Sequence, residues 1–217
     1  KEKGFNVELV IIPVQGWRRD KLQDATGLPW RNPSPNMRNL TQAILYPGVG
    51  LLEFCSLSVG RGTDTPFEVL GAPYIDDLLL AGVMNAKKLP GITFLPIRFT
   101  PDASKFSGQV CGGVNLVLTD RKAFKAVETG IQLAVVLHKL YPRKFDLKKV
   151  NTLLGHPKIL ADIRDGRPAR EILQGWKDDE MRFRKRRREF LLYPGPGLEL
   201  QDLLRLEILG FELQLFR

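Results

Sequence analysis

The most informative run of this 217-residue sequence is Ser58-Val59-Gly60-Arg61-Gly62-Thr63-Asp64-Thr65-Pro66-Phe67. Two of its glycines flank Arg61, and glycine permits positive φ and a close approach of the backbone to a ligand. An arginine held on such a loop is suited to bind a carboxylate or phosphate through two parallel hydrogen bonds. The run has no lysine of the phosphate-loop type, so it predicts an anion site of another kind.

Upstream of this loop, Glu53 interrupts the apolar run Val49–Leu57, which has the composition of a strand. A carboxylate among apolar neighbours is costly unless it is paired. The sequence leaves two roles open for Glu53, an ion pair with Arg61 or a hydrogen bond to a substrate. Hydrolysis by carboxylates also stays open, and Glu53 is the candidate catalytic residue within this chain.

Several common chemistries are disfavoured by the residue types. His138 and His156 are the only histidines, which argues against His-based triads and multi-histidine metal sites. There is no nucleophile elbow of the Gly-x-Ser-x-Gly type. Cys55 and Cys111 are either free buried thiols or one mutual disulfide, and their number and spacing suggest no metal site. We therefore expect no cofactor and no metal.

The net charge of +9 is concentrated in one run, because six of the seven residues in Arg182–Arg188 are basic. The run is either a solvated helix face or a contact for an anionic polymer. A single interleaved aromatic residue, Phe183, and the lack of a recognised motif argue against nucleic acid. No apolar run reaches the length of a transmembrane helix.

Apolar patterning predicts strands alternating with helices, and hence a mixed α/β domain of packed layers. Asn6–Val14 is nearly all apolar, as in a strand of a parallel sheet buried on both faces. Pro96 predicts either an edge position or a bulge for its strand. The other expected strands are Val49–Leu57, Ile92–Phe99 and Gly113–Thr119; the expected helices are a short one that ends at Tyr46-Pro47-Gly48, then Tyr74–Lys88, Ala126–Leu140, Val150–Leu154, Lys158–Asp165 and Ala169–Tyr193.

These residues carry a family resemblance over roughly Phe5 to Tyr193. The chain resembles the NamZ-type exo-β-N-acetylmuramidases. The resemblance lies in Pro33-Ser34-Pro35-Asn36-Met37, Tyr46-Pro47-Gly48, Leu52-Glu53, the loop run from Leu57 through Glu68, Gly71-Ala72-Pro73, Arg98-Phe99-Thr100-Pro101, Phe106-Ser107-Gly108, Cys111-Gly112-Gly113-Val114, Thr119-Asp120-Arg121 and Phe190-Leu191-Leu192-Tyr193. Cys55 and Ser56 depart from the pattern, where we expect Thr-Asn.

The resemblance implies an enzyme that releases N-acetylmuramic acid from the non-reducing ends of peptidoglycan fragments. Its N-terminal half is Rossmann-like, its C-terminal half is α/β, and the active cleft lies between them. The proposed catalytic glutamate of such enzymes lies in a Gly-Pro-Glu-His-Gly type motif of the N-terminal half, and this chain has no such motif. We therefore expect the C-terminal half of a two-domain enzyme, inactive by itself, with the N-terminal half as its partner.

On this interpretation, residues 1–193 are the C-terminal domain and residues 194–217 are a linker and tail of unknown origin. Asn36, Glu53, Arg61, Gly62 and Thr63 are expected to bind the saccharide, with Arg61 facing the lactyl carboxylate of N-acetylmuramic acid. The start at Lys1 suggests a mid-protein beginning, and we expect the full-length protein to be exported. Two alternatives stay open, a non-catalytic module that binds anionic polymers through residues 182–188, and a half that only completes its partner's fold.

Overall fold

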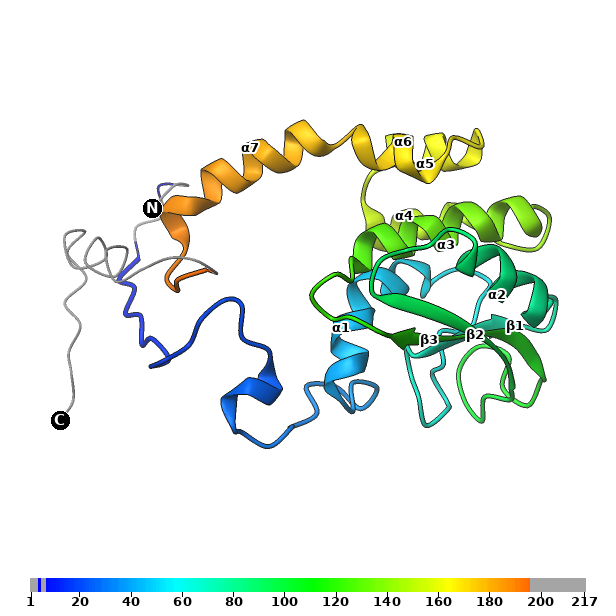
Figure 1. Cartoon of the computed structure of the whole chain (residues 1–217), viewed down its shortest axis with the longest axis horizontal. Coiled ribbons are helices and arrows are strands. Elements are labelled where there is room, and N and C mark those ends of the chain that lie inside the picture. The colour runs from blue at the N-terminus through cyan, green and yellow to red at the C-terminus, as the bar shows by residue number, and fades with distance from the viewer. Residues whose placement is uncertain (1–3, 5–6, 196–217) are drawn as a thin grey trace. The chain divides into compact units, whose positions relative to one another are not determined.

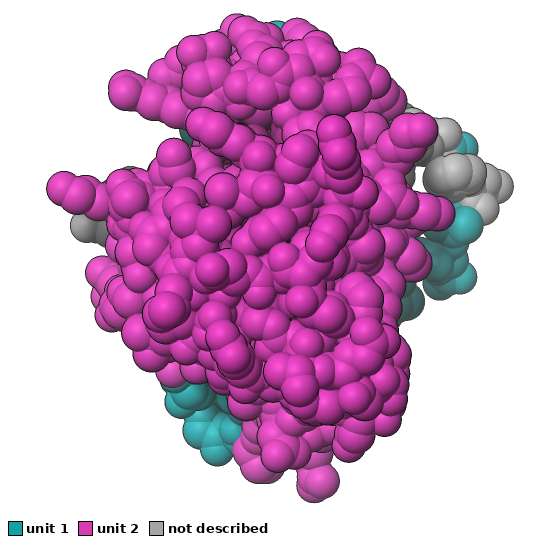
Figure 2. All heavy atoms as spheres, turned by 90° about the vertical axis from the view of Figure 1, so that its right-hand side faces the viewer, with its two compact units in different colours: residues 1–28, 179–217 teal, residues 29–178 magenta. Residues whose placement is uncertain are grey.

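The computed structural model describes residue 4 and residues 7–195 of the chain. Residues 29–178 form one compact unit, and the described residues before and after them belong to a second (Figure 2). The unit of residues 29–178 contains the sheet and most of the helices (Figure 1). The expected tail falls mostly outside the described residues, since only Pro194 and Gly195 of it are described.

The sheet has three strands in the order β1-β3-β2. The strands are β1 (Val69–Ala72), β2 (Ile92–Phe99) and β3 (Cys111–Leu118), and both pairs are antiparallel. The predicted strand at 92–99 is confirmed, and of the two alternatives for it the edge position is observed. Pro96 pairs in register with Val114, and an edge strand tolerates a proline because its outer side needs no hydrogen-bond partner.

Helices supply the other layer, and together with the small antiparallel sheet they confirm the predicted mixture of helices and strands. The helix predicted at 126–140 is present as α3 with the same bounds. The helices are α1 (Leu40–Val49), α2 (Asp77–Asn85), α3 (Ala126–Leu140), α4 (Asn151–Leu154), α5 (Pro157–Arg164), α6 (Ala169–Gln174) and α7 (Lys177–Arg187), with 3-10 turns η1 (Gln23–Thr26), η2 (Gly50–Leu52), η3 (Leu147–Val150) and η4 (Arg188–Phe190).

The core lies between the sheet and α2 and continues around α3. Helix α2 packs on β2 and β3, while α3 packs on α1 and on the α5–α6 pair (Figure 1). Side chains from each of these elements are fully buried, among them Phe94, Leu116, Leu80, Leu133 and Leu137. Burial of this apolar surface is the main favourable term in folding.

Helices α1 and α3 approach each other through two glycines. A Cβ atom on Gly48 would come within 3.0 Å of the Ala126 backbone, and one on Gly130 would do the same to the Gly48 backbone. This contact explains why α1 continues through Pro47 to Val49, whereas we predicted that Tyr46-Pro47-Gly48 ends the helix. Burial of Leu45 and Val49 outweighs the local cost of a proline inside the helix.

The predicted strand at Val49–Leu57 is wrong. The run ends α1, continues as η2 and then forms turns, and the next residue, Ser58, makes an isolated bridge with Gly71. Leu52, Cys55 and Leu57 are fully buried. Since burial explains their apolar character in any backbone conformation, periodicity could not separate a compact turn from a buried strand.

Two further predictions at the ends of the chain are wrong. Residues 7–14 form no strand, and their side chains are exposed, with Ile12 exposed by 88%. A strand requires a hydrogen-bonding neighbour, and within the described part of the chain no strand lies alongside this run. The expected helix 169–193 is divided at Gly175 into α6 and α7, and α7 buries no residue.

The cysteines are free thiols, and both are buried. Burial raises the pKa of the Cys55 thiol to about 12, and it raises the pKa of Cys111 as well. Of the two possibilities left open by the sequence, the buried thiols are therefore the ones observed.

The glycine contact between α1 and α3 yields a stability prediction. Gly130→Ala places a methyl group against backbone that cannot rotate away, so we expect a loss of about 1–3 kcal/mol in the free energy of unfolding, the usual cost of overpacking. Gly82→Ala is the matched control, because Gly82 lies in α2 with open space around it. There alanine should be neutral or stabilising by up to about 1 kcal/mol. Urea denaturation of both variants measures the difference, and equal effects would contradict the prediction.

Candidate functional site

The loop around Arg61 turns through two glycines in the left-handed region. Gly60 has φ +79° and Gly62 has φ +78°, a conformation that side-chain-bearing residues rarely adopt. A Cβ on Gly62 would come within 3.0 Å of the Ala103 backbone, and the carbonyl of Gly62 accepts a hydrogen bond from the Asp102 N–H at 2.8 Å. Gly62 is therefore required both by its backbone conformation and by its contact with the segment before Lys105.

The Thr63 side chain bridges main-chain groups within the loop. The Thr63 hydroxyl donates to the Gly60 carbonyl at 2.7 Å and accepts from the Thr65 N–H at 3.2 Å. The Phe67 N–H donates to the Val59 carbonyl at 2.7 Å, which joins the two ends of the loop. Thr63, predicted to bind substrate, thus has its hydroxyl engaged within the loop.

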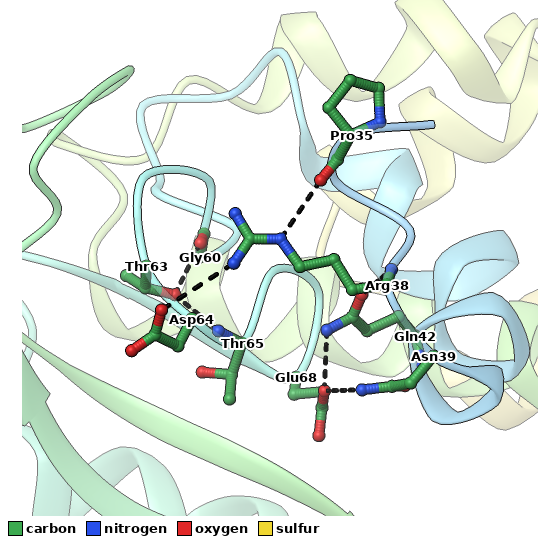
Figure 3. A network of polar contacts seen from close by, with 9 residues as sticks. All are labelled: Pro35, Arg38, Asn39, Gln42, Gly60, Thr63, Asp64, Thr65 and Glu68. Atoms are coloured by element: carbon green, nitrogen blue, oxygen red, sulfur yellow. Dashed lines mark hydrogen bonds and ion pairs between the residues drawn. The ribbon is translucent and has the colours of Figure 1, made fainter. Parts of the chain in front are cut away.

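A polar network ties the far end of this loop to the start of α1 (Figure 3). Glu68 Oε1 accepts from Asn39 Nδ2 at 3.0 Å and from Gln42 Nε2 at 2.9 Å. Asn39 is the N-cap of α1, and Gln42 is completely buried. Arg38 reaches across to Asp64 at 3.8 Å. The loop is therefore held at Gly62, at the bond between Phe67 and Val59, and at Glu68.

The ion pair between Glu53 and Arg61 is confirmed, with Arg61 Nη2 2.5 Å from Glu53 Oε1. The two side chains are only 18% and 32% exposed respectively. The guanidinium lies 5.4 Å from the centre of the Phe67 ring, a cation–π contact, and its Nε is buried without a hydrogen-bond partner. One edge of Arg61 is thus committed to Glu53, and Nε has unused hydrogen-bonding capacity.

Glu53 and Arg61 line a pocket of about 200 Å³. Its charged residues are these two and Lys105. The full lining is Glu53, Phe54, Leu57, Ser58, Val59, Arg61, Ser104 and Lys105. Sequence reasoning missed Lys105, since a single lysine in a loop carries no signal; only its position directly before the family run Phe106-Ser107-Gly108 pointed to this segment.

The structure brings together three of the five predicted binding residues in one loop and places Glu53 beside them. Asn36 lies elsewhere, in the turn before α1, where its N–H donates to Ser34 Oγ at 3.4 Å. Asn36 is absent from the lining of the pocket, so its role in binding stays a prediction.

The described histidines lie outside the pocket. The His156 side chain accepts from the Ile159 N–H and so caps α5.

In the described residues no group of three His, Cys, Asp or Glu side chains is placed to hold a metal ion. No helix among these residues is both long and apolar enough to cross a membrane. The basic run is solvated on α7, where Arg184 pairs with Glu180 and Arg182 with Asp179.

The family described as exo-beta-N-acetylmuramidase NamZ matches the chain in two parts. Its C-terminal domain matches residues 44–193, and its N-terminal domain matches residues 1–41. The first match alone spans more than half of the 217 residues. The chain belongs to the NamZ exo-β-N-acetylmuramidase family. The family resemblance of the loop residues is thereby confirmed.

A curated NamZ relative, the peptidoglycan beta-N-acetylmuramidase NamZ of Bacillus subtilis (strain 168), is 37% identical over 196 residues. The similarity covers 89% of this chain and 47% of the relative, so the chain spans about half the relative's length. A DUF1343 family protein of Bacteroides fragilis NCTC 9343 shares the fold, with a TM-score of 0.69 over 82% of this chain and 49% of that chain at 24% identity. A second one from that strain has a TM-score of 0.56 at 31% identity, over 76% and 44% of the two chains.

The boundary between the two NamZ domains does not coincide with the start of the compact unit. The family places its domain division between residues 41 and 44, whereas the compact unit begins at residue 29. The exposed run at residues 7–14 falls in the N-terminal match. The extent of 1–193 for the C-terminal domain stays a prediction.

The Glu53–Arg61 pair yields a test by double-mutant cycle. Because both side chains are largely removed from water, we expect Glu53→Gln and Arg61→Gln to show a coupling energy of about 1–2 kcal/mol in the free energy of unfolding. The control pair is Lys125 and Glu128, whose side chains are 60% and 41% exposed at 3.4 Å. Their coupling should not exceed about 0.5 kcal/mol. Similar couplings for the two pairs would mean that the Glu53–Arg61 pair is no stronger than a surface contact.

Proposed function

We propose that residues 29–178 supply substrate recognition to an exo-acting glycoside hydrolase that releases N-acetylmuramic acid from the non-reducing ends of peptidoglycan fragments. The observation that carries this proposal is the Arg61 guanidinium, held in a pocket by the glycine loop and by Glu53. Membership of the NamZ family and the name of the Bacillus subtilis relative support the substrate class.

The chemistry of the sugar fits this pocket. N-acetylmuramic acid differs from N-acetylglucosamine by a lactyl ether that ends in a carboxylate. A guanidinium has five N–H donors in a planar fork, and the close contact with Glu53 is made by Nη2. Arg61 therefore retains donors for the lactyl carboxylate, while Glu53 fixes the plane of the guanidinium.

We further propose that cleavage is carried out by carboxyl groups outside this pocket. Glycosidases of the usual kind need two carboxyl groups that flank the scissile bond. The pocket lining contains one carboxylate, Glu53, and that carboxylate is engaged by Arg61. In this division of labour the N-terminal half of the enzyme supplies the acid–base chemistry.

Asn36, Gly62 and Thr63 also have roles in this proposed function, and so does export of the enzyme. Asn36 is a candidate for the outer part of the substrate, and Gly62 and Thr63 shape the loop rather than contact the carboxylate. A peptidoglycan substrate favours an exported enzyme, which fractionation of the source cells tests. Detection of the protein only in the cytoplasm would contradict that part.

Paired ligands test the recognition proposal. In NMR titrations of this chain, Arg61→Ala should weaken binding of N-acetylmuramic acid at least about tenfold, because a charge-assisted contact is lost. It should change the dissociation constant of N-acetylglucosamine less than about twofold, since that sugar has no carboxylate to lose. For Arg61→Lys, the dissociation constant of N-acetylmuramic acid should lie between those of the unaltered chain and of Arg61→Ala, because lysine retains the charge without the planar fork.

The control is Arg170→Ala, which removes an exposed arginine of α6 outside the pocket and should leave both dissociation constants unchanged. The proposal fails if Arg61→Ala affects the two sugars equally, or if the unaltered chain does not distinguish them.

A further inference from the structure

We propose that Lys105 is a second cationic binding residue of the pocket and that the ligand's carboxylate is held between its ammonium group and the Arg61 guanidinium. This inference rests on the proposed function, because it concerns the same pocket. It adds a residue from a separate segment of the chain, which no sequence motif identified.

Main-chain contacts fix the position of the Lys105 side chain. Its ammonium donates to the carbonyl of Glu53 at 2.6 Å and to the carbonyl of Cys55. These carbonyls belong to the turns that follow η2, about 50 residues earlier in the chain. The contact is kept in place by the packing of Gly62 on Ala103, two residues before Lys105. The Lys105 ammonium is therefore pre-organised at the pocket wall before any ligand arrives.

The Lys105 ammonium has an N–H donor left for a ligand. A lysine ammonium has three donors, and two are used by the carbonyls of Glu53 and Cys55. In the described part of the chain, no carboxylate lies within ion-pair distance of Lys105. Burial lowers the pKa of Lys105, which reflects partial loss of water around the charged form. A partly desolvated cation attracts an anion more strongly than a solvated one does.

The charge and the volume of the pocket both indicate that it binds a small acidic group. Two cations, Arg61 and Lys105, face one carboxylate, Glu53, so the lining has a net positive charge. The volume of about 200 Å³ is below the roughly 300–1,000 Å³ of ordinary ligand pockets. An acidic substituent fits such a space while the sugar ring stays outside it, and Phe54, a residue of the lining that is 49% exposed, is available to contact the ring.

Two substitutions separate this role from a general loss of charge. Lys105→Met removes the ammonium group and keeps a long apolar side chain, and we expect the dissociation constant of N-acetylmuramic acid to rise about tenfold. The dissociation constant of N-acetylglucosamine should change less than about twofold. The matched control, Lys87→Met, removes an exposed lysine just after α2 and should change neither.

A measurement on the unaltered protein covers the case in which Lys105→Met does not fold. N-acetylmuramic acid at saturation should slow acetylation of Lys105 by an amine-reactive ester at least about threefold, because an ammonium held against a carboxylate reacts poorly. N-acetylglucosamine should not slow it, and acetylation of Lys87 should be insensitive to both sugars. Mass spectrometry of the digested protein measures each site.

The outcomes distinguish this inference from the proposed function. Binding of N-acetylmuramic acid that depends on Arg61, with no effect of Lys105→Met and no protection of Lys105, overturns the role of Lys105 alone. Equal effects of Lys105→Met on both sugars would show that Lys105 only supports the turns around Glu53 and Cys55, which also overturns it. No preference of the unaltered chain for the acidic sugar overturns both proposals.

Discussion

Arg61 reaches Glu53 because its loop turns through left-handed glycines on both sides and because three separate contacts hold that loop. Gly62 packs on the Ala103 backbone, Phe67 bonds back to Val59, and Glu68 is bonded to the start of α1. The resulting ion pair, 2.5 Å long and mostly shielded from water, places one cation and one carboxylate at the wall of a small pocket. Any change that moved the loop would separate the charges and leave a half-buried carboxylate unpaired, which is costly.

The balance of charges in the pocket favours binding over cleavage. One carboxylate beside two cations can hold an acidic group, whereas glycoside hydrolysis in its usual form needs a second carboxyl group. The chain spans about half the length of its Bacillus subtilis relative, and it matches both an N-terminal and a C-terminal domain of the NamZ family. The proposed function assigns recognition of the acidic substituent to one domain and bond cleavage to the other, which is consistent with both observations.

Local sequence predicted those parts of the fold whose physical cause is local. The apolar stripe of α3 and the proline at the edge of β2 gave correct elements, and the cost of an unpaired carboxylate made the ion pair with Arg61 one of the two roles expected for Glu53. The turns at residues 49–57 were mistaken for a strand because burial makes either conformation apolar. The run Asn6–Val14 was predicted as a strand from composition, although a strand depends on a neighbour elsewhere in space. Lys105 was missed for the same reason, since its role comes from packing between residues about 50 positions apart.

Hydrolysis of 4-nitrophenyl-β-N-acetylmuramide is the most direct test of the claim that this chain recognises the substrate and does not cleave it. The assay compares the chain alone with the product of its entire gene, at equal concentration. We expect release of 4-nitrophenol from the complete gene product and none from the chain alone, because the pocket contains a single, ion-paired carboxylate. Turnover by the chain alone, abolished by Glu53→Gln, would contradict this claim and make Glu53 a catalytic residue.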